Sequence, residues 1–226
     1  LIPHTKSPHS AMMKRSLFAS LTALACSVGA AHGAAEAFEI GPNNTSDLPK
    51  GREADGIIGD FVLRNDHIEA TISGNLPLRR ANMGTFYGSG GVTPGCLYDL
   101  TFRENSNDQI TIFSPSGQRG RVSYVRVADA GAEDAASVET VITAASNDGL
   151  AVRHLYHIED GWNGILITST YTNEGGTPQT VTTRDTWTRF DETGTFDGVT
   201  WASCINPADK TGYAFDIVQP TEDLPE

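Results

Sequence analysis

Apolar and polar residues alternate with a period of two through most of the chain after residue 55, and no window of ten or more residues carries a helical stripe. The clearest unit has alternating segments at 60–64 and 67–72, separated by Asn65 and Asp66. Asn and Asp tolerate the positive φ angles of a tight hairpin turn. The pattern therefore predicts two antiparallel strands joined at these residues.

Further alternating segments are separated by turn residues such as Asp148-Gly149 and Asp160-Gly161. Many strands joined by short turns indicate an all-β fold, an antiparallel β-sandwich, rather than alternating strands and helices. The additional strands are expected at 97–103, 109–113, 121–127, 137–144, 150–158, 164–172 and 180–190.

The first 35 residues have the composition of a cleavable signal peptide. Lys14 and Arg15 follow Met12-Met13, and the apolar stretch 16–28 is too short for an ordinary membrane-spanning helix. Small residues at 29–35 offer a cleavage site after Gly33. We therefore expect an upstream segment 1–11, a signal peptide 12–35, a mature chain from near Ala34 and a periplasmic or secreted location.

A competing interpretation makes Cys26 the acylated residue of a lipoprotein, since it follows Leu24-Ala25 at the end of the apolar stretch. Ala23 stands where a bacterial lipobox usually has Leu, and a conventional cleavage site follows. This pattern favours the cleaved, unlipidated form, with no membrane span after cleavage.

Removal of the signal peptide makes the chain more acidic. Three of the 16 basic residues and none of the 28 acidic ones precede Glu36, so the full-length net charge of −12 becomes −15, with 13 basic against 28 acidic residues. Such a field repels phosphate backbones, which argues against a nucleic-acid partner.

The rest of the chain divides into an N-terminal extension at 36–54, a β-sandwich domain at 55–218 and an acidic, proline-containing end at 219–226. The last segment resembles a linker, so we expect the natural polypeptide to continue into a downstream domain. Cys96 and Cys204 remain after cleavage, and an oxidising compartment would allow them to form a disulfide.

The long glycine-rich segment 73–95 is the first candidate for a binding surface, because long loops in compact domains are often functional. It carries Arg79, Arg80, Asn82 and Tyr87 as candidate ligand-binding residues. The alternative is a packed connection across the edge of the sandwich.

A second candidate surface lies at 184–191, where Asp185, Trp187 and Arg189 would share one face of a strand with Asp191. An indole flanked by polar groups could stack on a sugar ring and bind its hydroxyls. The same alternation also suits an exposed strand face with cross-strand ion pairs.

His154 and His157 lie three residues apart, which on a strand places them on opposite faces, so they are not expected to share a metal ion. Either could act with Asp185 as an acid-base pair. The chain has no Gly-x-Ser-x-Gly motif and no phosphate-binding loop. No catalytic set, metal site or cofactor is predicted.

Three segments resemble the galactose mutarotase-like supersandwich: Leu63 to Ile72, Gly95-Cys96-Leu97-Tyr98-Asp99-Leu100, and Tyr156 to Gly161 leading into 167–173. Members of that family process or bind carbohydrate. The stretch from 51 to 113 also resembles exported proteins of planctomycete-type bacteria, in which such a domain precedes a PHP-type metal-dependent hydrolase domain. The resemblance implies a supersandwich-like fold and a non-catalytic leading module, without the His-x-His motif of the hydrolase.

The resulting hypothesis is an exported, non-catalytic β-sandwich module of a larger protein, with carbohydrate as its ligand. The alternative is a mutarotase-like or lyase-like enzyme that uses a His/carboxylate pair. A third interpretation, a structural envelope protein, predicts a flat surface beneath residues 74–95.

Overall fold

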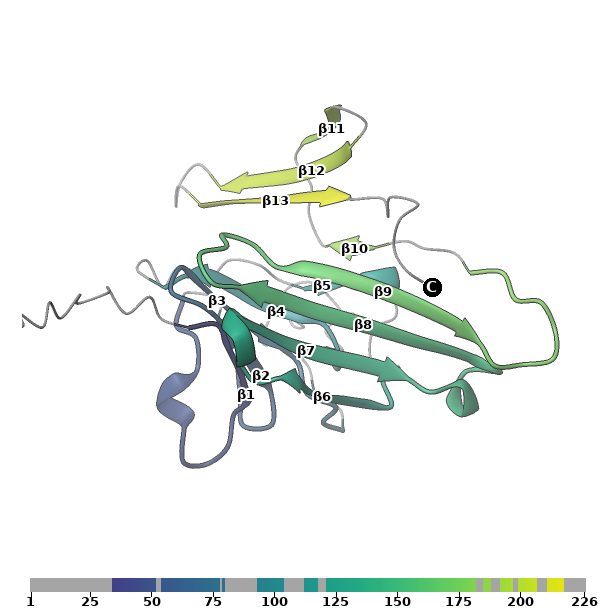
Figure 1. Cartoon of the computed structure of the whole chain (residues 1–226). Helices are drawn as coiled ribbons and strands as arrows, with labels where there is room; N and C mark the ends of the chain where they lie inside the picture. Colours follow the sequence, from purple (N-terminus) through teal and green to yellow (C-terminus); the bar gives the residue numbers. More distant parts are fainter. Residues whose placement is uncertain are drawn as a thin grey trace, which may run out of the picture. The chain divides into compact units, whose positions relative to one another are not determined.

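A computed structural model describes the chain as strands in antiparallel sheets (Figure 1). Within the described residues, helical structure is limited to single 3-10 turns at Thr45–Asp47, Pro115–Gly117, Ala132–Asp134 and Ala144–Ser146. The predicted all-β class is confirmed. The described residues are 34–51, 54–77, 79, 93–103, 112–117, 121–181, 185–187, 192–196, 199–206 and 211–217.

The largest sheet has six strands in the order β1-β2-β3-β4-β5-β10. Its strands are β1 (Glu36–Glu39), β2 (Phe61–Arg64), β3 (Ile68–Ile72), β4 (Leu97–Phe102), β5 (Phe113–Ser114) and β10 (Thr186–Trp187). The register between β3 and β4 shifts at Thr71/Ile72, where Tyr98 is the extra residue of a β-bulge. The segment predicted as an N-terminal extension thus contributes β1, which pairs with β2.

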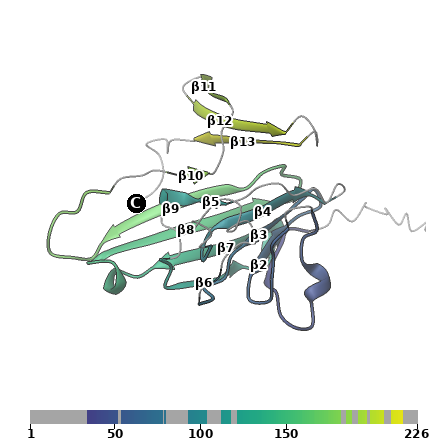
Figure 2. The same ribbon diagram turned by 180° about the vertical axis from the view of Figure 1, so that it is seen from behind.

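The second sheet is a four-stranded meander, visible from both sides in Figures 1 and 2. It consists of β6 (Tyr124–Asp129), β7 (Ala135–Ile142), β8 (Leu150–Glu159) and β9 (Leu166–Asn173). Along β8, buried and more exposed residues alternate from Val152 to Glu159, the period-two burial that the sequence pattern predicts.

These two sheets share one hydrophobic core, in which β1 contacts β6 and β7 and β2 contacts β7 and β8. The six-stranded sheet contributes Phe61, Leu63 and Ile72, and the meander contributes Val138 and Tyr156. Because alternate residues of each strand enter this core, the period-two pattern itself specifies which face of each strand is buried.

Three further strands form a separate antiparallel sheet that the sequence pattern did not predict. They are β11 (Glu192–Phe196), β12 (Val199–Asn206) and β13 (Thr211–Ile217). Thr, Ser, Gly and Ala provide nine of their 20 residues, spread over both faces of the strands. These small residues gave no clear apolar alternation, although the backbone pairs along all three strands.

The predicted hairpin between β2 and β3 is confirmed, but its turn works differently from the expectation. None of residues 65–67 has a positive φ angle. Instead, the Asn65 carboxamide oxygen accepts hydrogen bonds from the backbone N–H groups of His67 and Ile68, each at 2.9 Å. Its amide group donates to the carbonyl oxygens of Glu159 and Trp162. A fully buried asparagine therefore fixes the hairpin and ties it to the end of β8 and the turn that follows.

Candidate functional site

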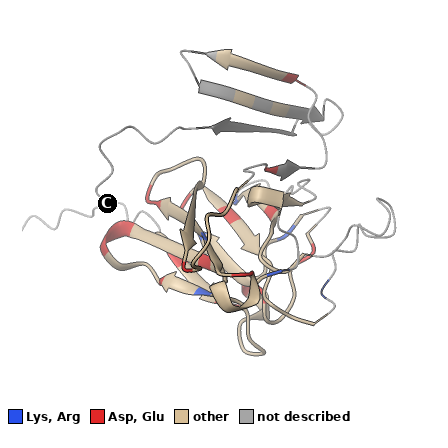
Figure 3. Ribbon diagram, turned by 90° about the vertical axis from the view of Figure 1, so that its right-hand side faces the viewer, with Lys and Arg blue, Asp and Glu red and all other residues tan. Residues whose placement is uncertain are grey.

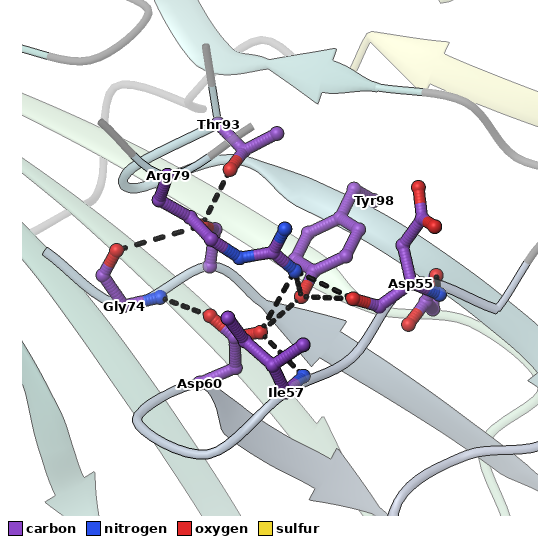
Figure 4. Close-up of polar contacts among 9 residues, drawn as sticks. Asp55, Ile57, Asp60, Gly74, Arg79, Thr93 and Tyr98 are labelled. Atoms are coloured by element: carbon purple, nitrogen blue, oxygen red, sulfur yellow. Dashed lines mark hydrogen bonds and ion pairs between the residues drawn. The ribbon is translucent and has the colours of Figure 1, made fainter. Parts of the chain in front are cut away.

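A buried polar cluster lies beside the six-stranded sheet, where residues from three separate segments meet (Figure 4). Its centre is Asp60, which is fully buried. The Arg79 guanidinium donates to Asp60 Oδ2 at 3.0 Å and to the Tyr98 hydroxyl at 2.5 Å, and the Tyr98 hydroxyl donates to the same carboxylate oxygen. A charged pair is thus hydrogen-bonded inside the protein, as a buried ion pair requires.

Backbone groups complete the coordination of Asp60. Its Oδ1 accepts from the Gly74 N–H at 2.9 Å and its Oδ2 from the Ile57 N–H at 2.8 Å. Arg79 also donates to the Asp55 carbonyl at 2.5 Å. The cluster therefore connects the chain before β2 with the start of the segment that follows β3.

The two described ends of the glycine-rich segment also bond to each other. Ser73 N–H donates to the Cys96 carbonyl at 2.8 Å, and Gly95 N–H donates to the Ser73 carbonyl at 2.9 Å. The Ser73 hydroxyl donates to Thr93 Oγ1 at 2.9 Å. These bonds between Ser73 and residues 93–96, together with the buried polar cluster around Asp60, hold both ends of the segment in a fixed position on the sheet.

Asp99 adds a second carboxyl group to this buried region. Its Oδ1 accepts from the Asp55 N–H at 3.1 Å, and the Thr71 hydroxyl lies beside its carboxyl group. Burial raises the pKa of Asp99 to about 7, and the bond from Asp55 opposes this shift. Asp99 therefore changes its charge near neutral pH.

Buried polar side chains also lie in the core on the inner face of the meander. The register places Val125, Thr140, His154 and Ser169 side by side across the four strands. His154 Nδ1 lies 2.8 Å from Ser169 Oγ, while His154 Nε2 and Thr140 Oγ1 are buried without a partner among the described residues. Burial lowers the pKa of His154 to about 4, against the opposing charge of Asp185, so the ring is neutral at pH 7.

Asp185 is exposed and precedes β10. Its Oδ1 accepts from the Ser116 N–H at 2.9 Å, and the Ser116 hydroxyl bonds to the Tyr171 hydroxyl of β9. Ser116 has a φ of +55°, a region that costs energy for a residue with a side chain. The charge of Asp185 raises the pKa of His154, but among the described residues no hydrogen bond joins their side chains.

His157 lies on the opposite face of β8 from His154, as predicted. Its ring packs edge-on against Trp162, with 5.6 Å between ring centroids, and its Nε2 lies 3.4 Å from Glu159 Oε1. The two histidines do not converge. Among the described residues, no group of three or more His, Cys, Asp or Glu side chains could hold a metal ion.

An open groove of about 270 Å³ lies on the outer face of the meander. The register aligns Tyr124, Val141, Arg153 and Thr170 in one row across the sheet, and Arg126 and Glu139 in the next. Residues of both rows line the groove together with Thr172. The face therefore combines an aromatic ring, two guanidinium groups, a carboxylate and two hydroxyls.

Glu139 holds the two arginines of this groove in place. Its Oε1 accepts from Arg126 Nε at 2.5 Å and its Oε2 accepts from Arg153 Nε, although Glu139 itself is only 3% exposed. Burial alone would raise the pKa of Glu139, but the bonds and charges of Arg153 and Arg126 outweigh it and lower the pKa. The Arg126 guanidinium also stacks over the Tyr124 ring, 5.2 Å from its centroid. The carboxylate is therefore ionised, and both guanidinium groups are held in one orientation.

The predicted ligand-binding residues are described only in part. Arg79 is 8% exposed and is bonded within the protein, so its contacts serve the fold. Trp187 pairs with Phe113 through its backbone, but its side chain, together with Arg80, Asn82, Tyr87 and Arg189, lies outside the described residues. Cys96 is buried, and the Cys204 side chain is also outside them, so the disulfide stays a prediction.

The sequence analysis did not select the groove residues, because none of them belongs to a motif or a cluster of polar residues along the chain. Their signal was available in the outward positions of the predicted strands, where Tyr124 and Arg126 alternate with valines and Arg153 alternates with Val152 and His154. Only the pairing of strands showed that Glu139 lies next to both arginines.

No protein-family model, no curated protein and no solved structure matches the chain. The resemblance to the galactose mutarotase-like supersandwich therefore stays a prediction. Among the described residues, none of the helices is long and apolar enough to cross a membrane.

Proposed function

We propose that the chain is an exported, non-catalytic β-sandwich module that binds carbohydrate on the outer face of its four-stranded sheet. The observation that carries the proposal is the groove in which Glu139 holds Arg126 and Arg153 in place beside Tyr124, Thr170 and Thr172. Sugars expose hydroxyl groups and flat apolar ring faces, so hydrogen-bonding side chains beside an aromatic ring suit them.

Export belongs to the same proposal and rests on the basic, apolar and small-residue order of the first 35 residues. The shared core of the two main sheets supports the sandwich architecture. By resemblance to exported proteins with a following hydrolase domain, the module would hold a glycan for a catalytic domain of the same polypeptide.

The proposal is tested with the purified full chain on a panel of soluble oligosaccharides, followed by calorimetry on any that bind. Thr170→Ala removes one groove hydroxyl and is expected to weaken binding about fivefold, the value of one hydrogen bond of about 1 kcal/mol. Thr168→Ala is the matched control, because Thr168 is exposed on the same face of the same strand but does not line the groove. Equal affinities of the two variants would contradict the proposed site.

A second candidate function is a mutarotase-like or lyase-like enzyme, and one observation favours it. His154 is neutral, bonds through one nitrogen to Ser169 and keeps Nε2 without a partner among the described residues, near the charge of Asp185. A general base needs such a free nitrogen. Catalysed sugar mutarotation or polysaccharide cleavage that His154→Gln abolishes and His157→Gln leaves intact would support it, and no turnover on either substrate class would reject it.

A further inference from the structure

The chemical character of the groove depends on which charged atoms face the solvent. The side chains of Arg126 and Arg153 are 64% and 46% exposed, whereas that of Glu139 is 3% exposed and lies between them. Each arginine side chain uses its Nε on Glu139, and neither guanidinium group makes another hydrogen bond to a described residue. The terminal guanidinium nitrogens are thus the charged donors presented to a ligand.

This cationic face stands out on an acidic protein. The chain has a net charge of −12, and Figure 3 shows acidic residues spread over the described ribbon. Three other described arginines are engaged elsewhere: Arg64 bonds to Glu36 and Asp47, Arg79 lies in the buried cluster and Arg103 donates to the Asn65 carbonyl. Arg126 and Arg153 converge on a single groove, where the two positive charges exceed the one negative charge.

We infer that the groove selects saccharides that carry a carboxylate, such as uronic acid residues. This inference rests on the proposed carbohydrate function and names its ligand class. A guanidinium group has a planar fork of donors that matches a carboxylate, and such charge-assisted bonds are about twice as strong as neutral ones. Thr170 and Thr172 provide the hydroxyl groups for the neutral part of the sugar.

The Arg126 side chain is already ordered before any ligand binds, which favours ligand binding over a purely structural ion pair. Arg126 is held by Glu139 on one side and by stacking on Tyr124 on the other. Side chains that are already ordered lose less rotamer entropy when a ligand binds. Glu139 thus acts as a positioning residue for both arginines.

The test compares two ligands with the same sugar chain: tetragalacturonic acid, whose carboxylates are charged, and its full methyl ester, which is neutral. On the full-length wild-type protein, the acid is expected to bind at least about tenfold more tightly, as one charge-assisted contact allows. The preference should shrink as salt is raised from 50 mM to 500 mM, because screening weakens exposed charge pairs. This comparison requires no mutant and so does not depend on a variant folding.

Variants then locate the preference. Arg153→Gln and Arg126→Gln are each expected to remove most of the difference between acid and ester, while Thr168→Ala keeps it. Arg153→Lys retains the charge but loses the planar fork, so it is expected to keep only part of the preference. Each glutamine variant leaves buried Glu139 with one partner fewer and is expected to lose some thermal stability. Loss of the acid preference in variants that are still folded at the assay temperature, as circular dichroism shows, supports the inference.

The outcomes separate the inference from the function on which it rests. If acid and ester bind equally and Thr170→Ala weakens both, the groove binds sugar but the charge selection is wrong. If poly-glutamate of the same charge binds as tightly as the acid, the groove recognises carboxylates rather than saccharides, and the saccharide inference is overturned. If no saccharide binds, both the inference and the proposed function fail.

Discussion

At the scale of single residues, the buried polar groups are the strongest constraint on this protein. Asp60, Arg79 and Tyr98 place an ion pair and a hydroxyl away from water, and each group is bonded to the others or to backbone. Removing one partner leaves the rest buried without full bonding, which costs more than the bond contributes.

Tyr98→Phe is therefore expected to destabilise the protein by about 1–3 kcal/mol, because Asp60 and Arg79 each lose a partner. Urea unfolding measures the change. Tyr124→Phe is the matched control, since that tyrosine is 37% exposed, and it should change stability by less than about 0.5 kcal/mol. An equal effect of both variants would show that the cluster does not contribute to stability.

The buried Asp99 is expected to make the protein less stable as pH rises, whereas a carboxylate with a lowered pKa makes a protein less stable as pH falls. Its folded pKa of about 7 is above the usual value of 3.8, so the folded state binds more protons between these two values. The free energy of unfolding therefore falls as pH rises from about 4 to about 7. Asp99→Asn should remove this slope and gain stability over the wild type at pH 8, and a variant curve parallel to wild type would refute the assignment.

His154 is expected to make the free energy of unfolding sensitive to acid. Its folded pKa of about 4 is below the usual 6.5, so the unfolded state binds more protons between pH 4 and 6.5, and stability falls as pH is lowered through that window. The loss attributed to this residue is up to about 3 kcal/mol. His154→Gln should flatten that part of the curve, whereas His157→Gln on the outer face should follow the wild type.

At the scale of elements, most of the strands that enter the shared core are ones that the sequence pattern predicts. Period-two alternation predicted β2, β3, β4 and the four strands of the meander, since their alternate residues enter one core. The strands β11 to β13 were missed because small polar residues give no such alternation. The turn at Asn65 was placed correctly, but its mechanism depends on Glu159 and Trp162, which are 94 and 97 residues away.

The candidate site was predictable only in part, because its contacts join residues that are far apart in the sequence. Sequence reasoning selected Arg79 as a ligand residue, but it could not place Asp60 and Tyr98 around the guanidinium. It also paired His154 with Asp185 as a hypothesis, which stays a prediction: the charge of Asp185 raises the pKa of His154, but burial outweighs it. The Arg126-Glu139-Arg153 arrangement depends on registers across three strands, which no local pattern reveals.

One glycine decides how the segment after β3 starts. A Cβ atom at Gly74 would lie 1.8 Å from the Gly59 carbonyl oxygen, which is backbone and cannot move aside easily. Gly74→Ala is therefore expected to break the bond from its N–H to Asp60 and to destabilise the protein by more than about 2 kcal/mol. Gly164→Ala, which meets nothing within 4 Å, is the control, and thermal unfolding of both variants measures the difference.

At the scale of the whole molecule, charge and architecture point in the same direction. The chain carries a net charge of −12, and its paired arginines form a local cationic surface on one sheet. Tight packing fills the inner face of that sheet, whereas its outer face carries the polar groove. Under the proposed function, the inner face of the meander serves stability and the outer face serves recognition.

The central claim is that ligand binding takes place on the outer face of the meander. Amide NMR shift mapping on the ¹⁵N-labelled full chain, titrated with tetragalacturonic acid, tests it most directly. The expected result is saturable shifts centred on Arg126, Glu139, Arg153 and Thr170, with no change around Arg79. Shifts centred on Arg79 or His154, or none at millimolar ligand, would contradict it.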